Sequence, residues 1–232
     1  MRDSLTVFWK EVLETFGNRH SFRGALFQGL LVIAITGVMV PAMQPEVLGT
    51  VGPAAFLYVV FPATLAATVA SDSFAGERER KTIDTLMSTP LTDMPIFVGK
   101  AATAVLFVTV VAMVALAVAC ITAFAQGFSA EMAQPIMFAG VIAGAVAGSL
   151  VTAAFAIAIS VRLPVARAVQ QMASILTFIL AAVVVVVFDR LGLPINWRTI
   201  LRADAAVFVV GVVALGVAKQ LFRRDRLFEN RG

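Results

Sequence analysis

Long apolar runs separated by short polar segments make up most of the chain. Each run is close to the roughly 20 residues that a helix needs to cross about 30 Å of hydrocarbon. Apolar residues occupy every side of these segments, as in a membrane-spanning helix. The predicted spans are roughly 24–42, 51–70, 101–125, 135–160, 169–188 and 204–220. Since no repeat or linker divides them, we expect one polytopic transmembrane domain over 1–232, an all-α integral membrane protein.

Composition supports a membrane protein. Hydrophobic residues are 60% of the chain and charged residues only 14%, against about 25% in soluble domains. The net charge of +4 does not indicate nucleic-acid binding, because the cations lie at the ends of the apolar runs. The single cysteine, Cys120, lies inside an apolar run and cannot form an internal disulfide.

The distribution of Lys and Arg predicts the orientation. If the N-terminus is cytoplasmic, 15 of the 18 cations fall in inner segments, and only Arg190, Arg198 and Arg202 fall outside. Inner loops of membrane proteins carry this excess of positive charge. We therefore expect a multi-pass protein of the cytoplasmic (inner) membrane with both termini in the cytoplasm.

The loop 72–100 is unusual because it is highly charged. Its stretch FAGERERKTIDTLMSTPLTDMPIFVGK, residues 74–100, carries eight charged residues. Ile83, Leu86 and Met87 share one face of a short helix, which would present a surface to another protein. The alternative is a solvated loop whose charges only set the topology. A second amphipathic segment, 1–20, has the pattern of a helix lying in the membrane interface.

The loop 72–100 also carries a resemblance. Its pattern F-x-x-E-R-E…T-x-x-x-L-x-x-x-P-L, followed by Gly-Lys, resembles the type-2 ATP-binding-cassette (ABC) permeases. The matching residues are Phe74, Glu77, Arg78, Glu79, Thr82, Leu86, Pro90, Leu91, Gly99 and Lys100. The six spans and the amphipathic N-terminus extend the resemblance over most of the chain.

The resemblance implies a permease subunit, usually of an exporter, that pairs with a second permease subunit and with separate ATPase subunits. Segment 1–20 would be the connecting helix, and the loop 72–100 would contain a coupling helix that contacts the ATPase. The implied coupling residues are Glu77, Arg78, Glu79, Arg80, Lys81, Thr82, Ile83, Leu86 and Met87. The substrate is not specified.

The sequence contains no phosphate-binding loop of the form G-x-x-x-x-G-K-[ST], because Ala101 follows Gly99-Lys100. We therefore expect no ATPase activity and no cofactor in this chain, with ATP and Mg²⁺ bound by the partner. The sole histidine, His20, precedes the first span, and no cluster of metal-ligand residues is evident, so no metal site is expected.

The family analogy places the second and fifth spans along a central cavity at the dimer interface. The implied pathway residues are Phe61, Thr64, Thr68, Gln171, Ser174, Thr177 and Phe178. Pro62 should interrupt the second span, as a hinge or a static kink. Gly140, Gly144 and Gly148 form a smooth stripe for close helix packing, within the subunit or between subunits. The segment 189–204 is either a reduced re-entrant helix, with Trp197 in the headgroup layer, or an ordinary loop.

No ionisable residue lies in the central part of a predicted span. Proton- and sodium-coupled carriers usually need such groups, so this absence disfavours a secondary carrier. The other alternative is a non-transporting membrane scaffold or sensor that uses the loop 72–100 to dock a cytosolic partner. A neighbouring gene for an isolated ATPase domain would favour the ABC permease over both.

Overall fold

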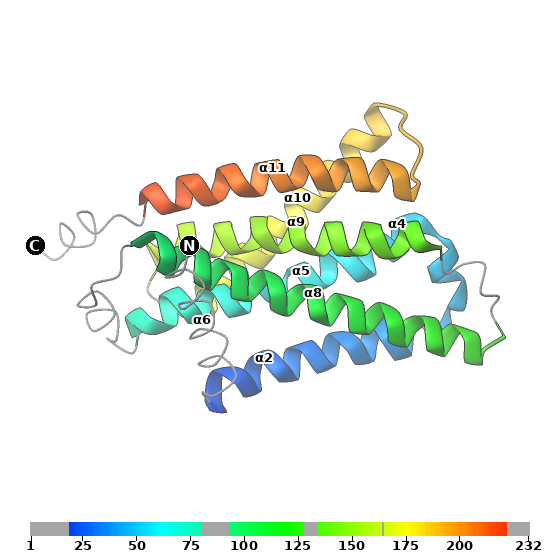
Figure 1. The fold of residues 1–232 in the computed structure, drawn as a ribbon, viewed down its shortest axis with the longest axis horizontal. Coiled ribbons are helices and arrows are strands. Elements are labelled where there is room, and N and C mark those ends of the chain that lie inside the picture. The colour runs from blue at the N-terminus through cyan, green and yellow to red at the C-terminus, as the bar shows by residue number, and fades with distance from the viewer. Residues whose placement is uncertain (1–18, 80–92, 128–133, 164, 222–232) are drawn as a thin grey trace, which may run out of the picture.

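The structure is a computed structural model that describes residues 19–79, 93–127, 134–163 and 165–221. Regular structure in these ranges is entirely helical, and six segments are long and apolar enough to cross a membrane. They are Gly24–Met43, Val51–Gly76, Val98–Ala125, Pro135–Ser160, Ala166–Arg190 and Trp197–Ala218. The predicted all-α integral membrane class is therefore confirmed. Most of these helices run roughly along the long axis of the bundle, and Ala166–Arg190 runs obliquely to them (Figure 1).

The sixth span begins earlier than its apolar pattern indicated. Helix α11 (Trp197–Leu221) begins at Trp197 rather than at 204. Asn196 lies just before it, and its Oδ1 accepts a hydrogen bond from the backbone N–H of Thr199 at 2.9 Å. This bond satisfies one of the free N–H groups of the first turn, so Asn196 caps the helix. Arg198 and Arg202 remain exposed, which allows the helix to continue through its polar first turns.

The first span is built from three helical pieces. Helix α2 (Arg19–Val32) leads into a π-helical segment, η1 (Ile33–Met39), and then into α3 (Val40–Met43). The 3-10 helix η2 (Pro45–Gly49) connects this span to the second. The π-helical segment η1 lies close to the third span. A Cβ on Gly37 of η1 would be only 3.0 Å from the carbonyl oxygen of Ala115.

The second span is also interrupted, as Pro62 predicts. It consists of α4 (Val51–Ala55), the π-helical η3 (Phe56–Val60), α5 (Phe61–Ala63) and α6 (Leu65–Glu79). Proline has no N–H to donate, so the regular ladder cannot pass through it. The Thr64 hydroxyl donates to the carbonyl oxygen of Phe61 at 2.7 Å and so provides a donor inside this irregular turn.

A hydrogen bond joins the two π-helical segments. The hydroxyl of Tyr58, on η3, donates to the carbonyl oxygen of Thr36, on η1, at 3.0 Å. Both residues are fully buried. The wider π turn leaves backbone carbonyls available for other partners, and this one is used to hold the first two spans together.

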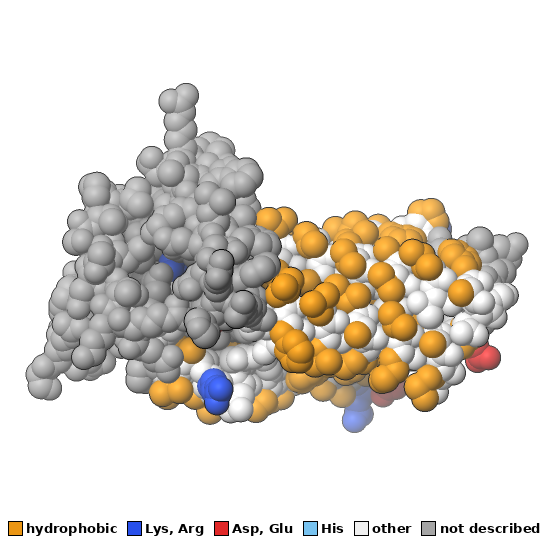
Figure 2. All heavy atoms as spheres, turned by 90° about the horizontal axis from the view of Figure 1, so that it is seen from below, with side chains coloured by type: hydrophobic (Ala, Val, Ile, Leu, Met, Phe, Trp, Pro, Cys, Tyr) orange, Lys and Arg blue, Asp and Glu red, His pale blue; other side chains and the backbone are white. Residues whose placement is uncertain are grey.

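Helices α8 (Asp93–Ala125), α9 (Pro135–Ser160) and α10 (Ala166–Arg190) complete the bundle with α11. Helix α9 lies between α8 and α11 (Figure 1) and carries much of the core. It is rich in Ala and Gly, which lets neighbouring backbones approach. By contrast, most residues of α10 and α11 are exposed. Apolar side chains also cover much of the described part of the opposite face of the bundle, which Figure 2 shows. In a membrane protein, exposed apolar surface of this kind faces lipid or the apolar surface of another subunit.

Candidate functional site

The predicted coupling segment, residues 77–87, starts at the end of α6. Glu77, Arg78 and Glu79 form the last residues of that helix, which extends past the expected end of the span at 70. Helix α8 resumes at Asp93. The other predicted coupling residues, namely Arg80, Lys81, Thr82, Ile83, Leu86 and Met87, lie outside the described residues, as do residues 1–18 of the predicted connecting helix.

A buried lysine joins the two helices that flank this segment. Lys100, on α8, is 1% exposed, and its Nζ donates to the carbonyl oxygen of Ser73, on α6, at 2.7 Å. The same Nζ lies 5.3 Å from the centre of the Phe74 ring, within the range of a cation–π interaction. We call Ser73, Phe74 and Lys100 the base cluster.

The base cluster also contacts two further helices. Phe74 is 2% exposed and packs with Ile157 of α9 and Ala218 of α11. The end of α6, which leads into the predicted coupling segment, is thus held against α8, α9 and α11. In the sequence analysis, Phe74 and Lys100 were used only as positions of the family pattern, and it was not predicted that the lysine would lie over the phenylalanine ring. The available signal was a lysine at the start of an apolar run, because such an intramembrane charge requires a partner.

A chain of polar side chains links α6 to α2 and α10. Gln170 Nε2 donates to Thr68 Oγ1 at 2.9 Å, and the Thr68 hydroxyl donates to Gln28 Oε1 at 2.7 Å. Thr68 was among the predicted pathway residues, whereas Gln28 and Gln170 were missed. Gln171, the neighbour chosen from sequence, is exposed on the described chain.

The remaining predicted pathway residues occupy different surroundings. Thr64 bonds to its own helix, while Ser174 and Phe61 are half-buried. The Thr177 hydroxyl forms a buried hydrogen bond of 2.7 Å with that of Thr152 on α9. The Phe178 ring lies 6.2 Å, centre to centre, from the Phe56 ring of η3.

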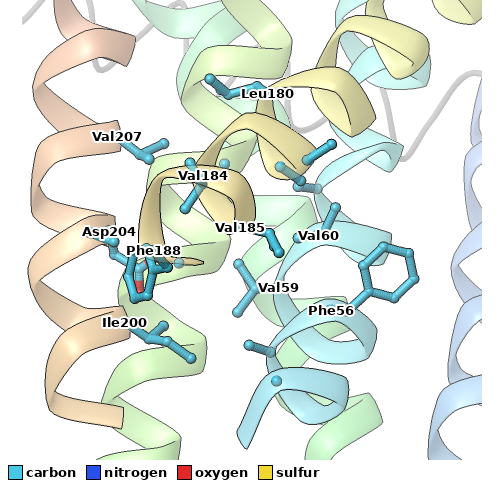
Figure 3. Close-up of a pocket in the computed structure, with 18 of the residues that line it drawn as sticks. Phe56, Val59, Val60, Leu180, Val184, Val185, Phe188, Ile200, Asp204 and Val207 are labelled. Carbon is cyan, nitrogen blue, oxygen red and sulfur yellow. The ribbon is translucent and has the colours of Figure 1, made fainter. Parts of the chain in front are cut away.

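Thr177 and Phe178 line a cavity of about 610 Å³. It is bounded by the α4–α5 part of the second span, α9, α10 and α11 (Figure 3). Phe61, Thr64, Thr68, Gln171 and Ser174 are not among its lining residues. The cavity has the size of a small-molecule site. Almost all lining side chains are apolar, the two exceptions being Thr177 and Asp204.

Asp204 corrects the sequence analysis. It was placed at the edge of the sixth span, but α11 begins seven residues before it, so Asp204 lies within the span Trp197–Ala218. At 1.5 Å per residue it is about 10 Å along the helix from Trp197. It is 8% exposed, and its Oδ2 has no hydrogen-bond partner among the described residues. The prediction that the spans contain no central ionisable residue was therefore wrong here.

The glycine stripe of α9 lies against other helices of the same chain. A Cβ on Gly140 would be 2.6 Å from Trp197 Cε3, and one on Gly144 would be 2.5 Å from Val59 Cγ1. The corresponding distance from Gly148 to Ala63 Cβ is 3.0 Å. Side chains at these positions would prevent the observed packing.

The segment 189–204 contains no re-entrant helix. Helix α10 ends at Arg190, and residues 191–196 form a short connection in which Gly192 has a φ of 59°. This left-handed conformation favours glycine. Trp197 is 7% exposed and packs against Gly140 of the glycine stripe.

The six apolar helices define a multi-pass membrane protein. The sequence profile of the ABC-2 family transporter protein matches residues 10–195, about four fifths of the chain. The chain therefore belongs to this family and is a membrane permease component of an ABC transporter. The match includes the predicted coupling segment and five spans but ends before α11, which carries Asp204. No curated protein matches the chain.

Proposed function

We propose that this chain is the permease subunit of an ATP-driven exporter in the cytoplasmic membrane. In this proposal residues 77–87 dock onto a separate ATPase subunit, and the chain pairs with a second permease subunit, identical or paralogous. The observation that carries the proposal is the base cluster, which joins both flanks of the coupling segment within a chain of the ABC-2 family.

The base cluster gives the coupling segment a mechanical connection to the bundle. Helix α8 is 33 residues long, and α6 is a continuous helix of 15 residues that ends inside the segment. Because Lys100 holds α6 to α8, a displacement of the segment would move both helices together. The hydrogen bonds of Thr68 would carry the movement of α6 to α2 and α10.

The irregular part of the second span provides a place for bending. Residues 56–64 include a π-helical turn and Pro62, and they lie on the far side of α6 from the coupling segment. Interrupted helices bend at such points more readily than regular ones. We propose that ATP-driven movement of α6 changes the angle at this point and so alters access to the cavity lined by η3. A static kink is the alternative.

The buried position of Asp204 bears on whether the chain could be an ion-coupled secondary carrier. The predicted absence of ionisable residues no longer excludes ion coupling, since Asp204 is a buried intramembrane carboxyl group. Membership of the ABC-2 family takes the place of that argument. In the proposed assembly ATP and Mg²⁺ bind to the partner, and this chain binds neither.

The test compares ATP hydrolysis by the chain alone with that of the complex. The chain, affinity-purified from its native membrane, should bring with it an ATPase that has a phosphate-binding loop. The complex should hydrolyse ATP and move substrate across reconstituted vesicles in the export direction. The matched control replaces the lysine of that partner's phosphate-binding loop, which should abolish both activities. Hydrolysis by the isolated chain, or a stable complex that hydrolyses ATP without any transport, would contradict the proposal, and the second result would favour a scaffold or sensor.

A further inference from the structure

The carboxyl group of Asp204 is a costly feature for a membrane protein to keep. It is 92% buried inside a membrane span, and its Oδ2 has no hydrogen-bond partner in the described part of the chain. An unpaired carboxylate in apolar surroundings is strongly destabilised relative to water. The group must therefore carry a proton or be paired with a positive charge that enters from elsewhere.

The cavity provides the route for such a charge. Asp204, on α11, is one of its lining residues and lies next to Phe188 of α10, while Val60 of η3 lies on the opposite side (Figure 3). Its Oδ1 lies 3.2 Å from the position that a Cβ on Gly144 would take, so the absence of a side chain there leaves room for the carboxyl group. Thr177, the other polar lining residue, already bonds to Thr152 and to the carbonyl oxygen of Ala173. Asp204 is therefore the one lining side chain with an uncommitted polar group.

The rest of the lining decides what kind of cation fits. Inorganic cations such as Na⁺ or Ca²⁺ need several oxygen ligands, whereas this lining offers Asp204 and an engaged threonine. The other walls are aliphatic or aromatic, including Phe56, Phe178 and Phe188. Aromatic faces attract cations, and apolar walls favour a hydrophobic body. No lining residue is basic.

The entrance is compatible with a ligand that partitions into the membrane. Phe56, Phe178 and Val185 line the cavity and are also exposed on the described chain, so the cavity opens at the apolar surface of the bundle. We infer that this cavity binds a lipophilic organic cation, with the Asp204 carboxylate as its counter-ion. The binding of the cation does not depend on the proposed function. Only the further statement that such cations are transported substrates rests on it.

Equilibrium dialysis of the purified full-length chain in non-ionic detergent tests the inference. The probe is radiolabelled tetraphenylphosphonium, and a parallel chamber with micelles alone corrects for partitioning. The wild-type chain should show saturable binding. Asp204→Asn keeps the size of the side chain and removes its charge, and it should weaken binding about tenfold or more, because a charge paired in apolar surroundings is lost. Asp204→Glu should retain most of the affinity.

Two controls separate the charge from the fold. Asp189→Asn removes an exposed carboxylate that does not line the cavity, and it should leave binding unchanged. Tetraphenylsilane has the same four-phenyl body without a charge or a hydrogen-bonding group, so its binding should be insensitive to Asp204→Asn. Equal binding of tetraphenylphosphonium by the wild type and Asp204→Asn would overturn the inference, as would the absence of saturable binding. Either result is consistent with a cavity that holds only lipid.

A second measurement needs no variant. Dicyclohexylcarbodiimide modifies carboxyl groups in apolar surroundings, and mass spectrometry should locate the adduct on Asp204. Tetraphenylphosphonium should lower the modified fraction in a saturable way. A modified fraction that is the same with and without tetraphenylphosphonium would overturn the inference. Neither experiment contains ATP or an ATPase, so a failure here is distinguishable from a failure of ATP coupling.

Discussion

Alanine substitutions along the glycine stripe of α9 should destabilise the protein in a graded way. A Cβ at Gly144 would lie 2.5 Å and 2.8 Å from the two γ-methyl groups of Val59, and one at Gly140 would lie 2.6 Å from the Trp197 ring. Carbon atoms in favourable contact are about 3.5–4.0 Å apart, so each substitution creates an overlap of about 1 Å. Valine is stiff about χ1 and the tryptophan ring is large, so neither neighbour can readily move aside.

Overpacking of this kind costs about 1–3 kcal/mol. We therefore expect Gly144→Ala and Gly140→Ala to lower the free energy of unfolding by about that amount. Gly148→Ala should cost less, since its Cβ would be 3.0 Å from Ala63 Cβ. For a chain of this length each kcal/mol corresponds to roughly 2–4 °C in the unfolding temperature.

The matched control is Gly216→Ala on α11, where an added Cβ meets no atom within 4 Å. It should be neutral or stabilising by about 0.4–1 kcal/mol, because alanine restricts the unfolded chain and favours helix. Thermal unfolding of the purified variants in one detergent measures the series. If Gly144→Ala unfolds at the same temperature as Gly216→Ala, the close packing of α9 against the second span is wrong.

Three further predictions concern coupling, the π-helical segments and topology. Lys100→Met removes the hydrogen bond to Ser73 and should lower ATP-dependent transport about tenfold, equivalent to about 1.4 kcal/mol, with the chain still inserted. Tyr58→Phe loses the bond between the first two spans and should lower the free energy of unfolding by about 0.5–1.5 kcal/mol, measured by thermal unfolding. A cysteine at residue 85 should be labelled from the cytoplasm only, and one at residue 130 from the outside only.

Each of these three predictions has a control or an outcome that would contradict it. Arg162→Met removes an exposed cation outside the base cluster and should leave transport unchanged. Equal transport by Lys100→Met and Arg162→Met would contradict the role of the base cluster. The labelling is carried out in a Cys120→Ala background, and external labelling at residue 85 would contradict the topology. An unchanged unfolding temperature for Tyr58→Phe would show that its hydrogen bond contributes nothing to the bundle.

Hydropathy was sufficient for the number and approximate positions of the spans, because an apolar run long enough to cross a bilayer has few alternatives. It failed at the start of α11, where Arg198, Arg202 and Asp204 interrupt the apolar pattern. The helix begins earlier because Asn196 caps it, a signal that is local and present in the sequence. This error in one helix boundary hid the intramembrane position of Asp204.

The site was less predictable than the fold because it depends on contacts between distant segments. Thr68 and Thr177 were predicted as pathway residues from the family analogy, but the contacts that they make with Gln170 and Thr152 depend on how the helices are rotated. The choice of Gln171 over Gln170 shows the effect, since a shift of one residue turns a side chain by about 100° around the helix. The contact of Lys100 with Ser73 likewise becomes visible only once α6 and α8 are packed.

The central claim is that residues 77–87 couple this permease to a separate ATPase. Glu77→Ala and Leu86→Asp test it most directly, because they change a charge and an apolar residue of that segment without touching the spans. The measurement is recovery of the ATPase in a pull-down together with substrate-stimulated ATP hydrolysis, and Glu131→Ala, in the loop predicted to lie outside, is the matched control. Both coupling variants should remain inserted yet lose the ATPase or the stimulation, while Glu131→Ala keeps both. Full recovery and full stimulation in Glu77→Ala and Leu86→Asp would contradict the claim and leave the loop as a topology signal alone.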